Sequence, residues 1–259
     1  MAERLIRLAE PQRAATLFEG WQETLIWSVL EGGMGCLWAL SESPRAALCE
    51  NGDFLFLAGS ADEPETRLLL ECWRQEKGAF EILVPRDLAC GVLIEAVFGR
   101  KVKASNRCAF HKGGEHFDRD ALRAMLESVP EDVSIIPFDR ELYHRALAQD
   151  WSRDFVSQFR NAEDYLARGL GYAAVCDGEL VGGASSYTCY SRGIEIQVET
   201  RADWQRKGIA CACCAALILA CMKRGLYPSW DAANPASAAL AQKLGYREAG
   251  VYPVWMLDK

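Results

Sequence analysis

A basic turn directly before a long apolar run is the feature that most constrains this chain. Residues 204–208 read WQRKG, and the fourteen residues that follow, 209–222, are all apolar. Fourteen residues are too few to cross a bilayer, which takes about 20. The run therefore predicts a buried helix, and the free backbone N–H groups at its basic start predict a site for an anion.

The composition of the chain limits which kinds of molecule can carry that anion. The chain has 259 residues, half of them hydrophobic, which is enough for one large domain or two ordinary ones. Its 29 basic and 36 acidic residues give a net charge of −7. This balance argues against broad binding of nucleic acid or anionic membrane, so any anion site is local.

Cysteine usage and the first residues indicate a cytoplasmic protein. Eleven cysteines are present, an odd number, and residues 1–12 lack the apolar core of a secretory signal. We therefore expect reduced thiols. Cys211 and Cys214 form a C-x-x-C inside the apolar run, where packing as small hydrophobes is favoured over redox or metal chemistry.

The first half reads as a mixed α/β domain. Strands are expected at 54–59, 80–85 and 101–110, with helices at 65–78 and 86–99. The segment 111–120 contains His111 and His116, beside Glu115 and Asp118, but this spacing matches no metal-ligand pattern, so we predict an exposed loop and no metal. A helix at 118–130 precedes a boundary near Pro130, which gives domains 1–130 and 131–259.

The second half has a clearer order. It begins with a strand at 133–139, helices at 140–149 and 161–170, and two strands joined at Asp177-Gly178. A strand at 193–200 precedes the basic turn and the apolar helix. After Gly225 we expect a strand at 227–233, a helix at 234–245 and a last strand pair.

The strand at 193–200 carries carboxylates on one side. Side chains alternate along a strand, so Glu195, Gln197 and Glu199 share one face while the isoleucines and Val198 share the other. The turn after it has the form Q-x-x-G-x-A, in which Gly208 allows close approach of a ligand and Ala210 leaves room. Acid/base groups therefore lie next to an anion site, although the turn alone would also suit an ordinary solvated cap.

This order of strand, Q-x-x-G-x-A turn, apolar helix, strand and Asn-headed helix resembles the GNAT superfamily of N-acetyltransferases from about Val133 onward. The stretches VETRADWQRKGIA and GLYPSWDAANPASAALAQKLGY are similar to two-domain members that include zwittermicin A resistance acetyltransferases. The resemblance implies an α/β fold with a mixed sheet, in which a GNAT acyl-CoA N-acyltransferase domain follows a smaller α/β domain.

The resemblance also implies acetyl-CoA in a V-shaped gap between the strands at 193–200 and 227–233. Backbone groups at Val198, Glu199 and Thr200 would hold the pantetheine and polarise the thioester. Asn234, which is equally a helix N-cap, and Ser237 would contact the cofactor from the other side. The pyrophosphate would lie on the turn formed by Gln205, Arg206, Lys207, Gly208, Ile209 and Ala210.

Transfer to an amine needs a base, because a protonated amine cannot attack a thioester. Glu195 or Glu199, directly or through water, is the candidate, and Asp231 would reach the amine; exposed or paired carboxylates are the competing interpretation. Many GNAT enzymes place a tyrosine, the general acid, where this chain has Ala241. Tyr246, Tyr227, Tyr252 or water remain as alternatives.

The function expected is acetyl transfer to a primary amine of a small molecule. If the three carboxylates converge, a cationic acceptor such as a polyamine or amino sugar is favoured, and residues 1–130 would form one wall of its site. The tryptophans at 21, 27, 38 and 73 would line that wall or, more simply, fill a core. The alternatives are a non-catalytic acyl-CoA-binding or scaffold module and transfer of another acyl group.

Overall fold

The computed structural model describes residues 4–78, 80–113 and 117–257. The chain forms two compact units: Met1–Arg107 together with Val251–Lys259, and Cys108–Gly250. The second unit therefore starts ahead of the position near Pro130 at which the sequence suggests a boundary. The reason is α4 (Arg119–Leu126), which packs against α7 (Ile209–Arg224) of the second unit.

The first unit is built on a sheet in which five strands lie in sequence order. Neighbours are antiparallel from β1 to β4, whereas β4 and β5 are parallel and are joined through α2. Trp73 of α2 is only 2% exposed in the core of this unit, so it is a packing residue. The elements are β1 (Ile6–Arg7), η1 (Pro11–Phe18), α1 (Thr24–Leu30), β2 (Cys36–Ala39), β3 (Ala47–Asn51), β4 (Phe54–Ala58), α2 (Pro64–Glu76), β5 (Ile82–Pro85), α3 (Leu88–Phe98) and η2 (Gly99–Lys101).

Two strands run from one unit into the other. The end of β6 (Val102–Phe110) belongs to the second unit, where residues 108 and 109 pair with β12 (Asp231–Ala232). The end of β13 (Glu248–Leu257) belongs to the first unit, where residues 255 and 256 pair with β5. Each unit thus includes the end of a strand that begins in the other.

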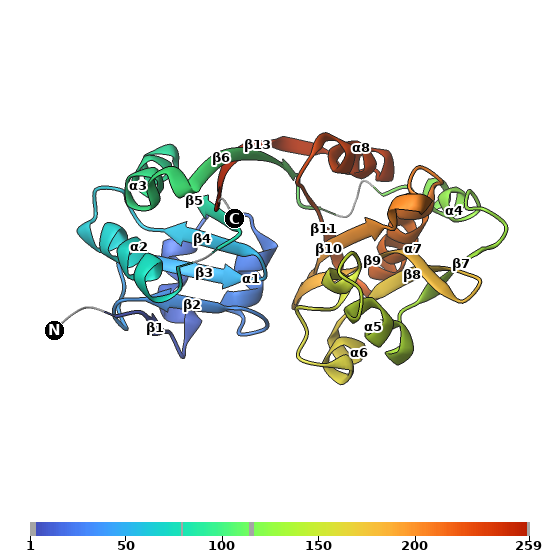
Figure 1. Ribbon diagram of the computed structural model, residues 1–259, viewed down its shortest axis with the longest axis horizontal. Coiled ribbons are helices and arrows are strands. Elements are labelled where there is room, and N and C mark those ends of the chain that lie inside the picture. The colour runs from blue at the N-terminus through green and yellow to red at the C-terminus, as the bar shows by residue number, and fades with distance from the viewer. Residues whose placement is uncertain (1–3, 79, 114–116, 258–259) are drawn as a thin grey trace. The chain divides into compact units, whose positions relative to one another are not determined.

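The second unit has a five-stranded sheet in the order β11-β10-β9-β8-β7. All its pairs are antiparallel except β10 and β11, which are parallel and joined through α7 (Figure 1). The expected turn at Asp177-Gly178 joins β8 to β9, and both residues have positive φ. The elements are β7 (Val133–Pro137), α5 (Arg140–Leu147), η3 (Arg153–Phe155), α6 (Ala162–Arg168), β8 (Gly171–Cys176), β9 (Glu179–Tyr190), β10 (Gly193–Thr200), η4 (Ala202–Trp204), β11 (Tyr227–Ser229) and α8 (Pro235–Leu244).

Helices cover both faces of this sheet. A Cβ on Gly182 would lie 2.6 Å from Ile209 of α7, whereas one on Gly183 would lie 3.1 Å from Phe155 of η3. Successive strand residues point to opposite faces, so α7 covers one face and η3 the other. The predicted apolar helix is confirmed: most of α7 is buried, including Ala212 through Ala215. In the part of the chain that the structure describes, no helix is long and apolar enough to cross a membrane.

The same order of elements occurs twice. In the first unit, three antiparallel strands (β2–β4) lead through α2 to parallel β5 and then to α3 and β6. In the second unit, β8–β10 lead through α7 to parallel β11 and then to α8 and β13. The chain therefore contains a structural repeat that its sequence does not display.

The eleven cysteines all lie in the described part of the chain and are free thiols. Nine are buried, among them Cys211, Cys213, Cys214 and Cys221 of α7. Burial raises the pKa of the Cys221 thiol to about 12. The C-x-x-C is thus packed as small apolar side chains, as expected.

Candidate functional site

The N-terminus of α7 is open, unlike the other helix starts. Its N-cap is Gly208, in the left-handed region at φ +83°, and no side chain caps the helix there. The other α-helices of the described chain each have a capping Glu, Asp or Asn side chain. Arg206, two residues earlier, also has positive φ, at 62°. The first N–H groups of α7 are therefore available to an anion, as the Q-x-x-G-x-A pattern predicts.

Side chains fix this turn to the sheet. Gln205 Nε2 donates to the backbone oxygen of Thr200 over 3.3 Å, and Lys207 Nζ lies 4.2 Å from the ring centre of Trp204. Ile209 is 1% exposed, whereas Ala210 is half-buried. Gln205 and Ile209 thus anchor the turn at its two ends, and the exposed Arg206 and Lys207 supply local positive charge.

β10 and β11 separate in mid-strand. Their parallel pairing covers Gly193 to Glu195 and ends where Glu195 faces Ser229. The chain after β11 continues into β12, which pairs with β6 instead. Residues 196–200 of β10 therefore have no β11 partner in the described chain, as a gap between these strands would require. The V-shaped gap itself stays a prediction.

The register of β10 assigns its side chains to faces. Thr200 lies opposite Gly182 on the α7 side, and Glu199 lies opposite Gly183 on the η3 side. Alternation then places Val198 with Thr200, and Gln197 with Glu199. The pairing of β10 with β9 shifts register between Glu195 and Ile196, so of the predicted carboxylate face Gln197 and Glu199 are assigned to the side turned away from α7.

The structure separates the two predicted glutamates along β10, and Asp231 lies on another strand. Glu195 is only 5% exposed, whereas Glu199 is half-buried and its Oε1 accepts from the backbone N–H of Thr200 over 3.1 Å. Four strand residues separate the two glutamates by about 13 Å, so they cannot share a proton. Asp231 lies on β12 opposite Ala109. Glu195 is the carboxylate beside the point where the strands part.

A cluster that sequence analysis did not identify surrounds Glu195. Lys112 Nζ donates to Ser229 Oγ over 2.7 Å, and Ser229 is the β11 partner of Glu195. Burial raises the pKa of the Tyr190 phenol to about 12; the charges of Arg192 and Lys112 oppose this rise, and that of Glu195 adds to it. Lys112 comes from the segment predicted as an exposed loop, in which Glu115 and His116 lie outside the described residues. No group of three or more potential metal ligands is present among the residues described.

Asn234 caps α8, which confirms one of its two readings. Its Oδ1 accepts from the backbone N–H of Ser237 over 2.9 Å, and Ser237 Oγ accepts from Trp230 Nε1 over 3.2 Å. Trp230 is 2% exposed and so belongs to the core. Asn234 remains exposed, so its role as a cap leaves its other oxygen lone pair available to a ligand.

The candidate general acids differ in their surroundings. Ala241 has no hydroxyl, and its side chain is fully buried in α8. Tyr246 donates to the backbone oxygen of Pro228 over 2.7 Å, and burial raises its pKa well above the ordinary value. Tyr227 donates to the backbone oxygen of His111 over 3.0 Å. Tyr252 belongs to the first unit. The two candidate tyrosines of the second unit, Tyr227 and Tyr246, therefore both hold hydrogen bonds within the fold.

Thr200 carries an unsatisfied group at this site. Its side chain is buried, and its Oγ1 has no hydrogen-bond partner among the residues described. Buried hydroxyls are normally bonded, so this one marks a place where a partner is missing. With the parted strands and the open start of α7, it fits a ligand that carries amide and phosphate groups, as acetyl-CoA does.

The corresponding place in the first unit is closed. β4 and β5 stay paired from Phe54 to Leu57, without parting. The helix that follows β4 has Pro64 at its first position, and the carboxylate of Glu63 accepts from the N–H of Glu65. The proline offers no N–H to an anion, and the carboxylates of Glu63 and Glu65 repel one. Among the described residues, the arrangement set out above is therefore found in the second unit and not at the start of α2.

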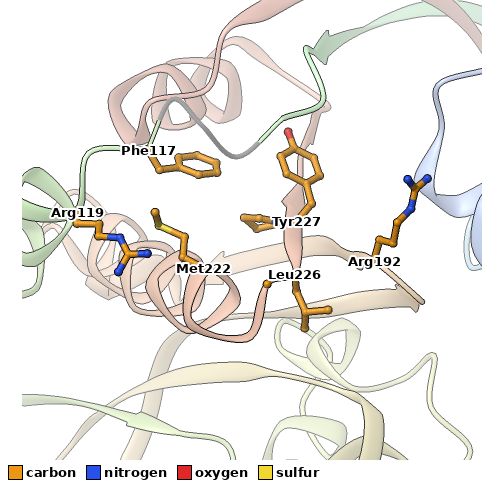
Figure 2. Close-up of a pocket in the computed structure, with 8 residues that line it drawn as sticks. Phe117, Arg119, Arg192, Met222, Leu226 and Tyr227 are labelled. Atoms are coloured by element: carbon orange, nitrogen blue, oxygen red, sulfur yellow. The ribbon is translucent and has the colours of Figure 1, made fainter.

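A cavity of about 300 Å³ lies at the far end of α7. Figure 2 shows Arg119 and Arg192 on two sides of Phe117, Met222 and Tyr227. Because α7 has 16 residues, it is about 24 Å long, so this cavity is well removed from Gly208. It is not part of the anion site.

Comparisons with known proteins agree with this architecture. The family described as GNAT acetyltransferase matches residues 15–255. The crystal structure of a GCN5-related N-acetyltransferase-like protein from Streptococcus suis 89/1591 is 42% identical, with a TM-score of 0.87 over 96% of this chain and 98% of that one. A tandem GNAT protein from the clavulanic acid biosynthesis pathway shares the fold at 13% identity, with a TM-score of 0.61 over 97% of each chain.

A curated relative extends the agreement to sequence. An uncharacterised N-acetyltransferase, YdfB of Bacillus subtilis strain 168, is 23% identical over 129 residues. That match covers 49% of this chain and 49% of the relative, so the chain spans about half the length of the curated protein it matches. The narrower resemblance to zwittermicin A resistance acetyltransferases stays a prediction. The chain belongs to the GNAT acetyltransferase family, whose members are acyltransferase enzymes.

Proposed function

We propose that this protein transfers the acetyl group of acetyl-CoA to a primary amine of a small molecule, and that the second unit does so. The observation that supports this most is that the pairing of β10 and β11 ends at Glu195 and Ser229, together with the uncapped N-terminus of α7, the α-helix that follows β10. An acyl-CoA has the shape and charge that such a gap and turn would accept.

Binding would use groups along β10 and the turn. The N–H groups from Arg206 to Ala210 would hold the pyrophosphate, with Lys207 and Arg206 adding charge. Backbone groups of Val198 and Thr200, left without a β11 partner, would bind the pantetheine amides. Asn234 and Ser237 would contact the cofactor from α8. When bound, acetyl-CoA supplies an activated acyl group with a thiolate leaving group.

The proton of the acceptor amine is the remaining problem. Glu195 lies where the pairing of β10 and β11 ends, so its carboxylate would accept that proton, directly or through one water. Glu199, about 13 Å along the strand, would instead lie beside the pantetheine. A thiol has a pKa of about 8.5, so the thiolate can depart without a dedicated acid at the position of Ala241.

The second candidate is an acyl-CoA-binding module without turnover, which the buried Ala241 favours. Titration calorimetry with acetyl-CoA is the first test. We expect micromolar binding with one site per chain, because the turn of the first unit is closed. Release of CoA in the presence of a panel of amines then separates an enzyme from a binding module. Other acyl-CoA donors test the third alternative, which is transfer of an acyl group other than acetyl.

Gly208→Trp should abolish binding, since a side chain there would enter the turn, with its Cβ 3.3 Å from the backbone oxygen of Ser128. Gly225→Trp is the matched control. Gly225 ends the same helix in the same left-handed conformation, with nothing within 4 Å of a Cβ. Unchanged affinity in Gly208→Trp, or equal losses in both variants, would contradict the proposed location.

A further inference from the structure

Lys112 reaches the centre of the second unit from outside its sheet. It lies two residues after β6, is half-buried, and donates through Nζ to Ser229 Oγ over 2.7 Å. Ser229 is fully buried. A lysine side chain is seldom held at a buried hydroxyl, because removing an ammonium from water is costly without compensating partners.

The compensating partner is indicated by the strand register. Ser229 and Glu195 are paired residues on parallel strands, so their side chains point to the same face and start about 5 Å apart. The phenol of Tyr190 lies within electrostatic reach of both Lys112 and Glu195. The ammonium and the buried carboxylate are therefore neighbours around one serine and one tyrosine.

Four other described ionisable groups share electrostatic interactions with this cluster, and none of these four is a buried cation. Tyr190 of β9, Tyr227 of β11 and Tyr246 after α8 are phenols, which are neutral near pH 7. Arg192, in the turn before β10, is exposed. A carboxylate that is 5% exposed is stabilised in its charged form by a cation that is also withdrawn from water.

We infer that Lys112 is a positioning residue of the transfer site: it orients Ser229 where β10 and β11 part and balances the charge of the Glu195 carboxylate. The role of Glu195 as base rests on the function proposed above, whereas the pairing itself does not. Near neutral pH the cluster keeps Glu195 able to take up a proton from an incoming amine. It also makes the site less acidic than its carboxylates alone suggest, which weakens the case for a polycationic acceptor.

The pairing is tested by following the side-chain carboxyl carbon of Glu195 by NMR during a pH titration, with Glu195→Gln to assign the signal. We expect the midpoint to rise by at least one pH unit in Lys112→Met, a tenfold change in proton affinity, and to return towards the native value in Lys112→Arg. Ser229→Ala should raise it less. Lys223→Met, at an exposed lysine of α7, is the control.

A midpoint in Lys112→Met within 0.3 units of the native one would overturn the inference, as would an equal rise in Lys223→Met. If Lys112→Met does not fold, the comparison of Ser229→Ala with the native protein decides in the same way. The activity readout is the pH dependence of CoA release with an amine found active in the panel. Its acidic limb should move upward in Lys112→Met while the KM for acetyl-CoA stays unchanged.

The two proposals fail separately. If the native protein releases no CoA with any amine, the proposed function fails, and the carboxyl titration still decides the role of Lys112. If the native protein is active and Lys112→Met has the native pH profile and midpoint, only the role of Lys112 fails.

Discussion

Replacing Thr200 by valine should have opposite effects on stability and on cofactor binding. The Thr200 hydroxyl is buried and without a partner among the described residues. An unpaired buried hydroxyl costs about 1–3 kcal/mol, and valine removes the hydroxyl at nearly the same volume. We therefore expect Thr200→Val to raise the free energy of unfolding of the free protein by about 1 kcal/mol. That corresponds to about 2–4 °C in Tm for a unit of this size.

In acetyl-CoA binding, the Thr200→Val variant should be the weaker of the two proteins. If the hydroxyl bonds the bound pantetheine, its loss costs about 0.5–1.5 kcal/mol of binding, a Kd about two- to tenfold higher. Scanning calorimetry without ligand and titration calorimetry with acetyl-CoA measure the two terms. The free variant should melt higher than the native protein, and saturating acetyl-CoA should protect it less.

The chain offers a matched control for this experiment. Thr66 of α2 is the other buried threonine whose Oγ1 has no partner among the described residues, and it belongs to the first unit. Thr66→Val should stabilise by a similar amount and leave the affinity for acetyl-CoA unchanged. The reasoning is refuted if Thr200→Val lowers the Tm of the free protein, or if its Kd for acetyl-CoA is native.

Three further outcomes are expected. Two neighbouring arginines hold the pKa of Asp164 well below its usual range, so its contribution is full above about pH 4 and is lost progressively as the pH falls from there to the lowered pKa. In urea unfolding, Asp164→Asn should therefore lose about 1–3 kcal/mol at pH 7, somewhat less at pH 3, and little only at a pH below the lowered pKa. A Cβ on Gly91 would lie 2.2 Å from Trp255, so Gly91→Ala should destabilise the first unit by about 1–3 kcal/mol and shift its tryptophan fluorescence. The control is Val92→Ala, at a side chain that is 68% exposed, which should change the free energy of unfolding by less than about 0.5 kcal/mol. Thiol titration of the native protein should detect at most the two partly exposed cysteines rapidly, and all eleven only after unfolding.

Local sequence patterns predicted most of the helices and strands. The elements that they missed are too short, or buried on too many sides, to show a period. The strand at 54–59, the helix at 65–78 and most elements from residue 133 onward are found within a few residues of their expected positions. The strand expected at 227–233 is instead divided into β11 and β12, and the expected last strand pair is the single strand β13. No element is predicted before residue 54. There β2 and β3 have four and five residues, and α1 is buried on most of its surface, so neither a two-residue nor a 3.6-residue period is visible.

The parts of the candidate site that the sequence predicted are local ones. The turn at Gly208 and the alternating carboxylates of β10 each occupy a few consecutive residues, so their spacing alone indicates them. Lys112 and Ser229 are 117 residues apart and meet only because the chain passes from β6 into the second unit. No local pattern connects them. Strand geometry also separates Glu195 from Glu199, which follows from their spacing along β10, while Asp231 lies on β12.

The repeated order of elements shows what distinguishes a binding unit from a scaffold unit. Both units place a helix directly after a strand that pairs in parallel with the next, and both helix starts carry partial positive charge. In the first, Asp62 and Glu63 precede α2 and Pro64 is its first residue, so the helix start is satisfied by the chain itself. In the second, Arg206, Lys207 and Gly208 leave it open. We therefore expect a chain of net charge −7 to bind the pyrophosphate of a CoA cofactor, because a few residues at one helix start decide the local charge.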